Sequence, residues 1–121
     1  MQLFEVIFYR DKNGNSEIED YIRELSKKSQ TSKADRTNIT KILSYLNSLS
    51  TYGTRIGKPV VKHITEDIWE LRPLSNRIFF FYWKDNKFVM LHHFIKKTQK
   101  TPKKEIETAK RHRDDFLERS K

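Results

Sequence analysis

The chain has 121 residues, enough for one hydrophobic core but not for two, so we expect a single domain over residues 1–121. Lys and Arg number 25 against 16 Asp and Glu, and the formal net charge of +9 favours a polyanionic partner such as nucleic acid. The absence of cysteine excludes disulfides and thiolate chemistry. No signal peptide or apolar run of transmembrane length is recognisable, and we expect a cytoplasmic protein that does not bind membranes.

The N-terminal half predicts one strand and two helices. Residues 3–9 are β-branched and aromatic, and the turn cluster at 11–14 stops this strand. Ser16 and Glu19 have the spacing of a capping box, which predicts a helix after Ser16. A polar stretch at 26–32 precedes a second helix that begins near Ser32. Both helices carry one apolar stripe, so we expect a helical hairpin that covers one face of a sheet.

Three strands are predicted in the stretch from Ile68 to Pro102, and a short edge strand precedes them at 60–62. They run over 68–72, 77–83 and 88–95, and Pro73 ends the first of them. Asp85 and Asn86 tolerate positive φ and predict a two-residue hairpin turn. Such a turn pairs Lys84 with Lys87, and therefore Phe81 with Met90, Phe79 with His92 and Arg77 with Phe94. A four-residue loop likewise pairs Arg72 with Arg77 and Glu70 with Phe79.

Side chains alternate along a strand, so this register assigns each residue to one of two faces. We expect a core on the face that carries Trp69, Leu71, Ile78, Phe80, Tyr82, Val89, Leu91, His93 and Ile95. We expect an open face that carries Glu70, Arg72, Arg77, Phe79, His92, Phe94 and Lys96. His93 is therefore predicted to be buried and satisfied. The predicted fold is α+β, with an antiparallel or mixed sheet, an N-terminal helical hairpin on one face and a C-terminal helix.

The predicted open face combines charges with aromatic rings. Two arginines placed opposite each other destabilise a hairpin by up to ~1 kcal/mol, and such conflicts are often found at functional sites. A solvated sheet face is the simpler interpretation of charged strand residues. The mixture of cations, a histidine and flat rings also suits an RNA ligand.

A basic run follows the last strand. From His92 to Arg113 there are eight Lys and Arg against two Glu, which attracts a phosphate backbone. The last helix is predicted to start with Thr101 as its cap and Pro102 in its first turn, and its stripe comprises Ile106, Ala109, Phe116 and Leu117. The residues predicted to bind RNA are Lys62, Phe79, Phe94, Lys97, Lys100, Lys103, Lys104 and Arg111.

The sequence predicts neither a metal site nor a cofactor. His92 and His93 are adjacent and point to opposite faces of a strand, and no glycine-rich phosphate loop is present. The chemistry that remains is attack of an RNA 2′-OH on its own phosphate, which requires positioning, proton transfer and charge neutralisation. Arg72 and Arg77 are candidate phosphate clamps, His92 a general acid or base, and Lys96 a stabiliser or acid. Glu70 is either a base or a structural ion-pair partner.

Three segments carry a resemblance to a known family: WELR at 69–72, NRIFFF at 76–81 and HHFIKKTQKTP at 92–102. With the order of elements, the chain from Leu3 to Phe116 resembles the RelE/ParE toxin superfamily, and within it the phage-derived HigB-like toxins. The resemblance implies a RelE-like fold and a toxin of a type II toxin–antitoxin pair. It also implies metal-free cleavage of mRNA in the ribosomal A site. The implied partners are the ribosome, mRNA and a helix-turn-helix antitoxin of HigA type, which alone would contact operator DNA.

Residue by residue, the resemblance matches Arg77, Arg72 and the basic run 96–100 to functional positions of RelE-like toxins. The chain departs from RelE in lacking a tyrosine after Tyr82 and a lysine pair near Ile68 and Glu70. His92 or a lysine would therefore replace the tyrosine as base. Two alternatives stay open: a ParE-like inhibitor of DNA gyrase and a non-catalytic nucleic-acid-binding module.

Overall fold

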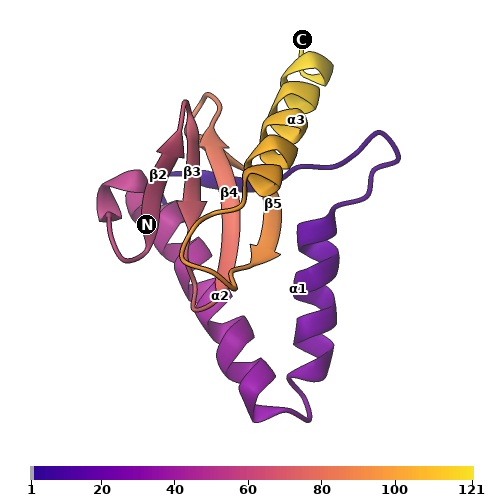
Figure 1. The fold of residues 1–121 in the computed structure, drawn as a ribbon, viewed down its shortest axis with the longest axis vertical. Helices are drawn as coiled ribbons and strands as arrows, with labels where there is room; N and C mark the ends of the chain where they lie inside the picture. Colours follow the sequence, from indigo (N-terminus) through magenta and orange to yellow (C-terminus); the bar gives the residue numbers. More distant parts are fainter. Residues whose placement is uncertain (1) are drawn as a thin grey trace.

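The computed structural model describes residues 2–121 and shows a mixed sheet between two helical layers. The helices α1 and α2 pack against one face of the sheet, and α3 crosses the other (Figure 1). The strands are β1 (Glu5–Phe8), β2 (Val61–Thr65), β3 (Ile68–Leu71), β4 (Asn76–Tyr82) and β5 (Lys87–Ile95). The helices are α1 (Glu17–Lys28), α2 (Lys33–Tyr52), the 3-10 turn η1 (Gly53–Ile56) and α3 (Lys103–Arg119). The predicted α+β fold is confirmed.

The five strands lie in the order β1-β5-β4-β3-β2, with β1 parallel to β5 and the other neighbours antiparallel. The N-terminal strand therefore joins the sheet beside the C-terminal strand. It also packs against the end of α2, where Gly53 adopts φ +67 and a Cβ would lie 2.9 Å from the ring of Phe4. A residue with a side chain would be strained at this position.

Both predicted helix starts are confirmed. The Ser16 hydroxyl accepts from the backbone N–H of Glu19, and the Ser32 hydroxyl accepts from that of Asp35. These caps satisfy N–H groups that have no partner inside the helix. Helix α1 continues to Lys28, into the stretch expected to be a polar linker, and β2 extends beyond its predicted end to Thr65.

The β4–β5 hairpin contains two irregularities that cancel each other. Asp85 and Asn86 both have positive φ as predicted, but Trp83 rather than Lys84 faces Lys87, where a backbone bond joins Trp83 N–H to Lys87 O at 2.9 Å. Phe81 consequently pairs with Val89, not with Met90. A bulge at Leu91 then adds one residue to β5, since Phe80 pairs with Met90 but Phe79 pairs with His92. The predicted pairs Phe79–His92 and Arg77–Phe94 are confirmed beyond the bulge.

The expectation of an open sheet face is wrong, because α3 covers it with a second apolar cluster. That cluster contains Ile68, Phe79, Phe81, Val89, Leu91, Phe94 and Ala109, with Ile106 and Phe116 packed against it. Val89 and Leu91 belong to this cluster and not to the predicted core, because the shifted turn and the bulge reverse their faces. The cluster under α1 and α2 holds Leu71, Ile78 and Phe80 as predicted. Tyr82 and Ile95, also assigned to that core, are exposed.

Helix α3 begins one residue later than predicted and is held at its sides by polar contacts. Pro102 is its N-cap and no side chain caps it, so Thr101 is not the cap that the sequence suggested. Leu117 is exposed rather than packed. Arg113 binds Glu66 and Asp67 of the β2–β3 turn at 3.1 and 2.7 Å. No helix among residues 2–121 combines the length and apolar character that crossing a membrane requires.

Candidate functional site

Four strands contribute one residue each to a row that crosses the sheet on the α3 side. Lys62 on β2 faces Glu70 on β3, Glu70 faces Phe79 on β4, and Phe79 faces His92 on β5. Directly paired residues project from the same face of a sheet. Arg77 lies two residues before Phe79 and therefore joins the same face. The structure thus brings together most of the residues predicted to be catalytic.

Glu70 and two arginines form the centre of this row. The Glu70 carboxylate is 1% exposed, and its Oε1 lies 3.5 Å from Arg72 Nε and 3.8 Å from Arg77 Nε. At these distances the carboxylate and the two guanidinium groups form ion pairs but no hydrogen bonds. Within residues 2–121, Glu70 Oε2 and both arginine Nε atoms have no hydrogen-bond partner. The arginine side chains are 25% and 11% exposed, so the guanidinium groups cover the carboxylate and border the surface.

The electrostatics of this cluster are unbalanced towards positive charge. Burial raises the pKa of Glu70, although Arg77, Arg72, Lys96 and Lys62 all act to lower it. Burial also lowers the pKa of Arg77, and Arg72 contributes to this shift. One carboxylate thus lies among four cations, and ionised or protonated it leaves an excess of positive charge. Such a site favours a phosphate group.

Arg77 is the more firmly held of the two arginines. Its Nη1 donates to Leu74 O at 2.7 Å in the loop between β3 and β4, and to Asn76 O at 2.8 Å at the start of β4. Lys96 reaches the same loop through its backbone N–H, which donates to Ser75 O at 2.9 Å. From there the segment 96–102 passes in front of β4 on its way to α3 (Figure 1). The predicted basic loop therefore lies at the arginine end of the site.

His92, at the other end of the row, is covered by α3. Its Nε2 lies 2.9 Å from Glu105 Oε1 in the first turn of α3, and its Nδ1 lies 3.8 Å from Glu17 Oε2 at the start of α1. The side chain is 11% exposed. An imidazole oriented by a carboxylate is a usual arrangement for an acid–base group. Here Phe79 separates it from Glu70, so the acid–base candidate and the phosphate clamps occupy neighbouring compartments.

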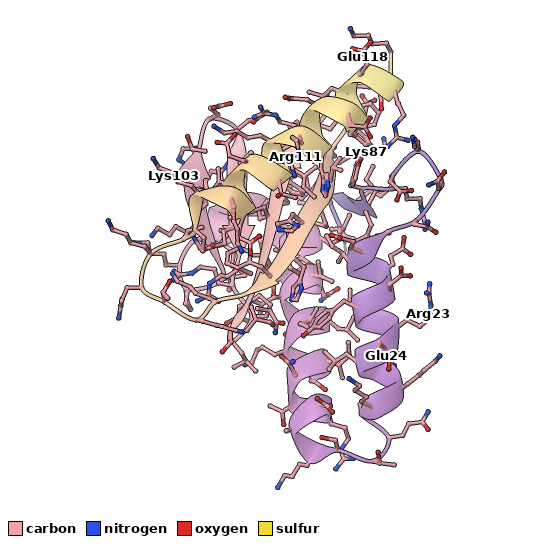
Figure 2. All side chains as sticks on the ribbon, turned by 45° about the vertical axis from the view of Figure 1, so that its right-hand side comes forward. Arg23, Glu24, Lys87, Lys103, Arg111 and Glu118 are labelled. Carbon is pink, nitrogen blue, oxygen red and sulfur yellow. The ribbon has the colours of Figure 1, made fainter. Side chains whose placement is uncertain are left out.

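The residues predicted to bind RNA fall into two groups. Phe79 and Phe94 are 0% and 8% exposed and pack against each other as tilted rings with centroids 5.3 Å apart, so in this structure neither presents a ring to a nucleotide. The basic residues are exposed, and Lys103 and Arg111 lie along α3 (Figure 2). The remaining exposed cations of the predicted set are Lys62, Lys97, Lys100 and Lys104.

Sequence reasoning missed three residues of this region: Glu105, Glu17 and Asn76. Glu105 and Glu17 look like ordinary acidic residues in the first turn of a helix, where they complement the helix dipole. Asn76 reads as a turn residue in the loop after Pro73. The only local indication that Asn76 lies near the site was its position directly before Arg77 at the start of β4. Its contacts with α1 and α2 are long-range and leave no local pattern.

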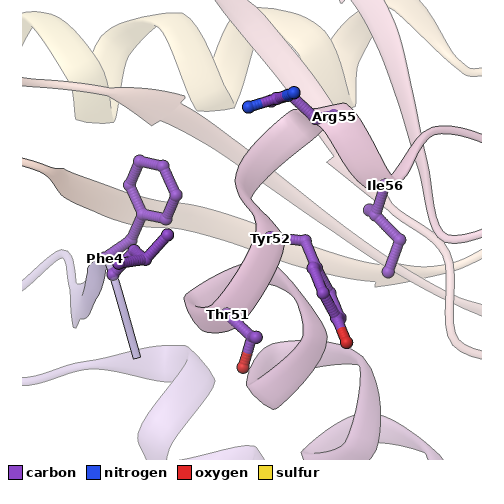
Figure 3. Close-up of a pocket in the computed structure, with 6 residues that line it drawn as sticks. Phe4, Thr51, Tyr52, Arg55 and Ile56 are labelled. Carbon is purple, nitrogen blue, oxygen red and sulfur yellow. The ribbon is translucent and has the colours of Figure 1, made fainter. Parts of the chain in front are cut away.

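A pocket on another part of the surface offers a contrast (Figure 3). It lies between the N-terminal strand and the end of α2, and Leu3, Phe4, Thr51, Tyr52, Arg55 and Ile56 line it. Arg55 is its one charged lining residue among residues 2–121, and no carboxylate or imidazole accompanies it. The pocket is apolar and lacks an acid–base pair, so the Glu70 row remains the better candidate for chemistry.

The fold and the clustered charges agree with a sequence comparison. Residues 20–114 match the family described as phage-derived protein Gp49-like (DUF891). The chain belongs to this family. The Gp49-like family is a relative of the RelE/HigB toxin superfamily, and the match includes both arginines, His92 and the basic loop. No curated protein matches the chain.

Proposed function

We propose that this Gp49-like protein is the toxin of a type II toxin–antitoxin pair and acts as a ribosome-dependent mRNA endoribonuclease. The observation that carries the proposal is the buried Glu70 carboxylate among Arg72, Arg77, Lys62 and Lys96. A site with excess positive charge at a partly exposed arginine pair fits the phosphate of an RNA strand. The family's relation to the RelE/HigB toxins and the basic face of α3 support the same function.

The proposed reaction is attack of a 2′-OH on the adjacent phosphate. Arg72 and Arg77 hold the phosphate and stabilise the charge that grows on its oxygens, while Lys96 approaches from the loop. Glu70 lies beneath both guanidinium groups, is 1% exposed and acts as their counter-ion rather than as the base. The 2′-OH loses its proton and the leaving 5′-oxygen gains one, and the reaction needs no metal or cofactor.

We assign proton transfer to His92, which Glu105 orients. Because α3 covers the imidazole, RNA reaches it only when the first turn of α3 moves aside. A His92→Ala variant that remains folded is expected to lose most cleavage, about 10²-fold. Undiminished cleavage by this variant would transfer the proton-transfer role to a lysine, with Lys96 as the first candidate.

The decisive experiment is primer extension on a defined mRNA. The purified protein is added to the mRNA on programmed ribosomes, and to the same mRNA without ribosomes, at the lowest magnesium that keeps ribosomes intact. Arg77→Ala is compared with Arg55→Ala, which changes an exposed arginine outside the site. We expect cuts on ribosomes only, about 10²-fold fewer with Arg77→Ala and unchanged with Arg55→Ala. Cleavage of free RNA would show a self-sufficient nuclease instead.

One observation favours a second candidate, a ParE-like inhibitor of DNA gyrase or a non-catalytic nucleic-acid-binding module. His92, Phe79 and Phe94 are all covered by α3, which suits a protein that acts by binding. Absence of cleavage with and without ribosomes would favour this alternative. A DNA-damage response on expression would then identify gyrase inhibition, and its absence would leave a binding module.

For the partner, we propose a helix-turn-helix antitoxin with an acidic contact surface that complements the net charge of +9. Attraction between exposed charges weakens with ionic strength. The complex should therefore dissociate faster at 1 M than at 0.1 M salt in surface plasmon resonance. Equal dissociation rates would show that apolar contacts, and not charge, hold the pair.

A further inference from the structure

Asn76 is buried at the point where α1, α2 and the loop between β3 and β4 meet. It is 1% exposed and is the first residue of β4, directly before Arg77. Its side chain makes four hydrogen bonds: Oδ1 accepts from Tyr21 Oη at 2.9 Å and contacts His93 Nε2 at 2.9 Å, while Nδ2 donates to Asn38 Oδ1 at 2.6 Å and to Pro73 O at 3.0 Å. All the hydrogen-bonding capacity of the amide is therefore used.

These bonds come from four different parts of the chain. Tyr21 belongs to α1, Asn38 to α2, His93 to β5 and Pro73 to the loop between β3 and β4. Because both lone pairs of Oδ1 are taken, His93 must donate from Nε2. Burial lowers the pKa of His93 to about 4, which keeps the ring neutral near pH 7, and the ring also stacks on Tyr21 at 4.0 Å. Asn76 thus ties the helical hairpin to one loop of the sheet.

That loop is the support of Arg77. The carbonyl groups that accept from Arg77 Nη1 belong to Leu74 and to Asn76 itself. Leu74 has φ +57, a conformation that is strained for an L-residue and persists only where the surroundings enforce it. Asn76 makes two hydrogen bonds to Pro73 O that close the loop. Its backbone N–H and its Nδ2 each donate to this oxygen at 3.0 Å.

We propose that Asn76 is a positioning residue for the proposed cleavage reaction: it fixes the 73–76 loop so that the Leu74 and Asn76 carbonyls aim the Arg77 guanidinium at the phosphate. Asn76 does not contact the RNA. It acts through Arg77, and the bonds from Tyr21, Asn38 and His93 extend this control to α1, α2 and β5. A displacement of about 1 Å at a clamp of this kind can slow a reaction about 10²-fold.

The test compares Asn76→Ala and Tyr21→Phe with Asn47→Ala, an exposed asparagine of α2 outside the site. Cleavage on programmed ribosomes is measured under single turnover over a range of ribosome concentrations, and thermal melting shows that each variant is folded. Asn76→Ala should cleave about 10- to 100-fold more slowly at saturation, with half-saturation changed less than about 2-fold. Tyr21→Phe removes one hydroxyl, keeps the ring and should lose about 3- to 10-fold. Asn47→Ala should match the wild type.

Two further measurements separate positioning from general stability. In the Arg77→Ala background, Asn76→Ala should cause no additional loss of cleavage. In protein with ¹⁵N-labelled arginine, the guanidinium N–H signals of Arg77 should broaden in Asn76→Ala and in Tyr21→Phe. Wild-type cleavage by a folded Asn76→Ala, an additional loss without Arg77, or unchanged Arg77 signals would each overturn the inference. If the wild-type protein cleaves no RNA, the proposed function fails while the Arg77 signals still decide the positioning role.

Discussion

The two faces of the sheet are built by different means. Under α1 and α2 the contacts are mainly apolar, with capped helix starts and a buried amide, Asn76, that makes four side-chain hydrogen bonds. Under α3 a smaller apolar cluster is surrounded by ion pairs that join the helix to the rest of the chain. The strand residues Glu70, Arg77 and His92 of the candidate site project to the α3 side. The larger apolar cluster thus lies under α1 and α2, and the charged cluster of the candidate site lies on the α3 side.

Several polar contacts attach α3 to the rest of the chain, and three of them illustrate its start, middle and end. His92 meets Glu105 near the start, Arg113 binds Glu66 and Asp67 in the middle, and Tyr9 donates to Asp115 at 2.6 Å near the end. Exposed or half-exposed polar contacts contribute less than buried apolar area and are weakened by salt. Helix α3 should therefore detach more readily than the helical hairpin, which suits the proposed function, in which this cover moves before RNA reaches His92.

Two neighbouring phenylalanines give the largest expected effect. Phe79 and Phe80 are both 0% exposed but project to opposite faces. Each change to Ala should lower the free energy of unfolding by about 3–5 kcal/mol in urea denaturation. Hydrogen exchange should separate them: Phe79→Ala exposes amides of α3, and Phe80→Ala exposes those of α1 and α2. Loss of protection in the same helices for both variants would mean that the faces are not independent.

The next largest expected effect is a pH dependence of the free energy of unfolding, and it arises on the sheet face under α1 and α2. Burial lowers the pKa of His93 to about 4, and the nearby His92 acts in the same direction. An unfolded histidine titrates near ~6.5, so between these values the unfolded chain binds more protons than the folded one. The contribution of His93 to the free energy of unfolding is therefore fully present above about pH 6.5. It is lost as the pH falls towards 4, and the loss amounts to at most ~3 kcal/mol.

His93→Gln keeps a donor for Asn76 and should make unfolding less dependent on pH in this range. His63→Gln, on the exposed edge strand β2, is the matched control and should retain the loss on acidification. Chemical denaturation at pH 7, 5.5 and 4.5 measures the free energy of unfolding of both variants and of the wild type. Identical pH dependence in His93→Gln and wild type would show that His93 is not the group responsible.

The side of the molecule formed by α1 and α2 was more predictable from the sequence than the α3 side, for physical reasons. Ser16, Ser32 and the apolar periodicity of α1 and α2 are local signals, and local hydrogen bonds enforce them.

The strand pairs Phe79–His92 and Arg77–Phe94 were also predicted correctly, although the assumed turn was wrong by one residue. The bulge at Leu91 restored the register, and no feature of the sequence announced it. The agreement therefore rests on two deviations that cancel.

The cover over the site could not be predicted, because it depends on where α3 docks. The stripe Ile106, Ala109 and Phe116 showed that α3 packs on something, but an interrupted stripe does not say on what. The charged residues of the site were correctly placed on one face by alternation alone. Their partners Glu105 and Glu17 come from other elements, and only tertiary contacts bring them to His92.

The smallest expected effect tests the polar attachment of α3 directly. Arg113→Ala removes the ion pairs to Glu66, Asp67 and Asp114. Burial acts to lower the pKa of the Arg113 guanidinium, but these carboxylates raise it. The free energy of unfolding should fall by about 0.5–1 kcal/mol at low salt, and by less at 1 M salt, because the lost attraction is screened. Lys121→Ala breaks only an exposed pair with Glu118 and should change nothing measurable. A loss that is equal at both salt concentrations would instead attribute the role of Arg113 to packing of its alkyl chain, and α3 would then be held as α1 and α2 are.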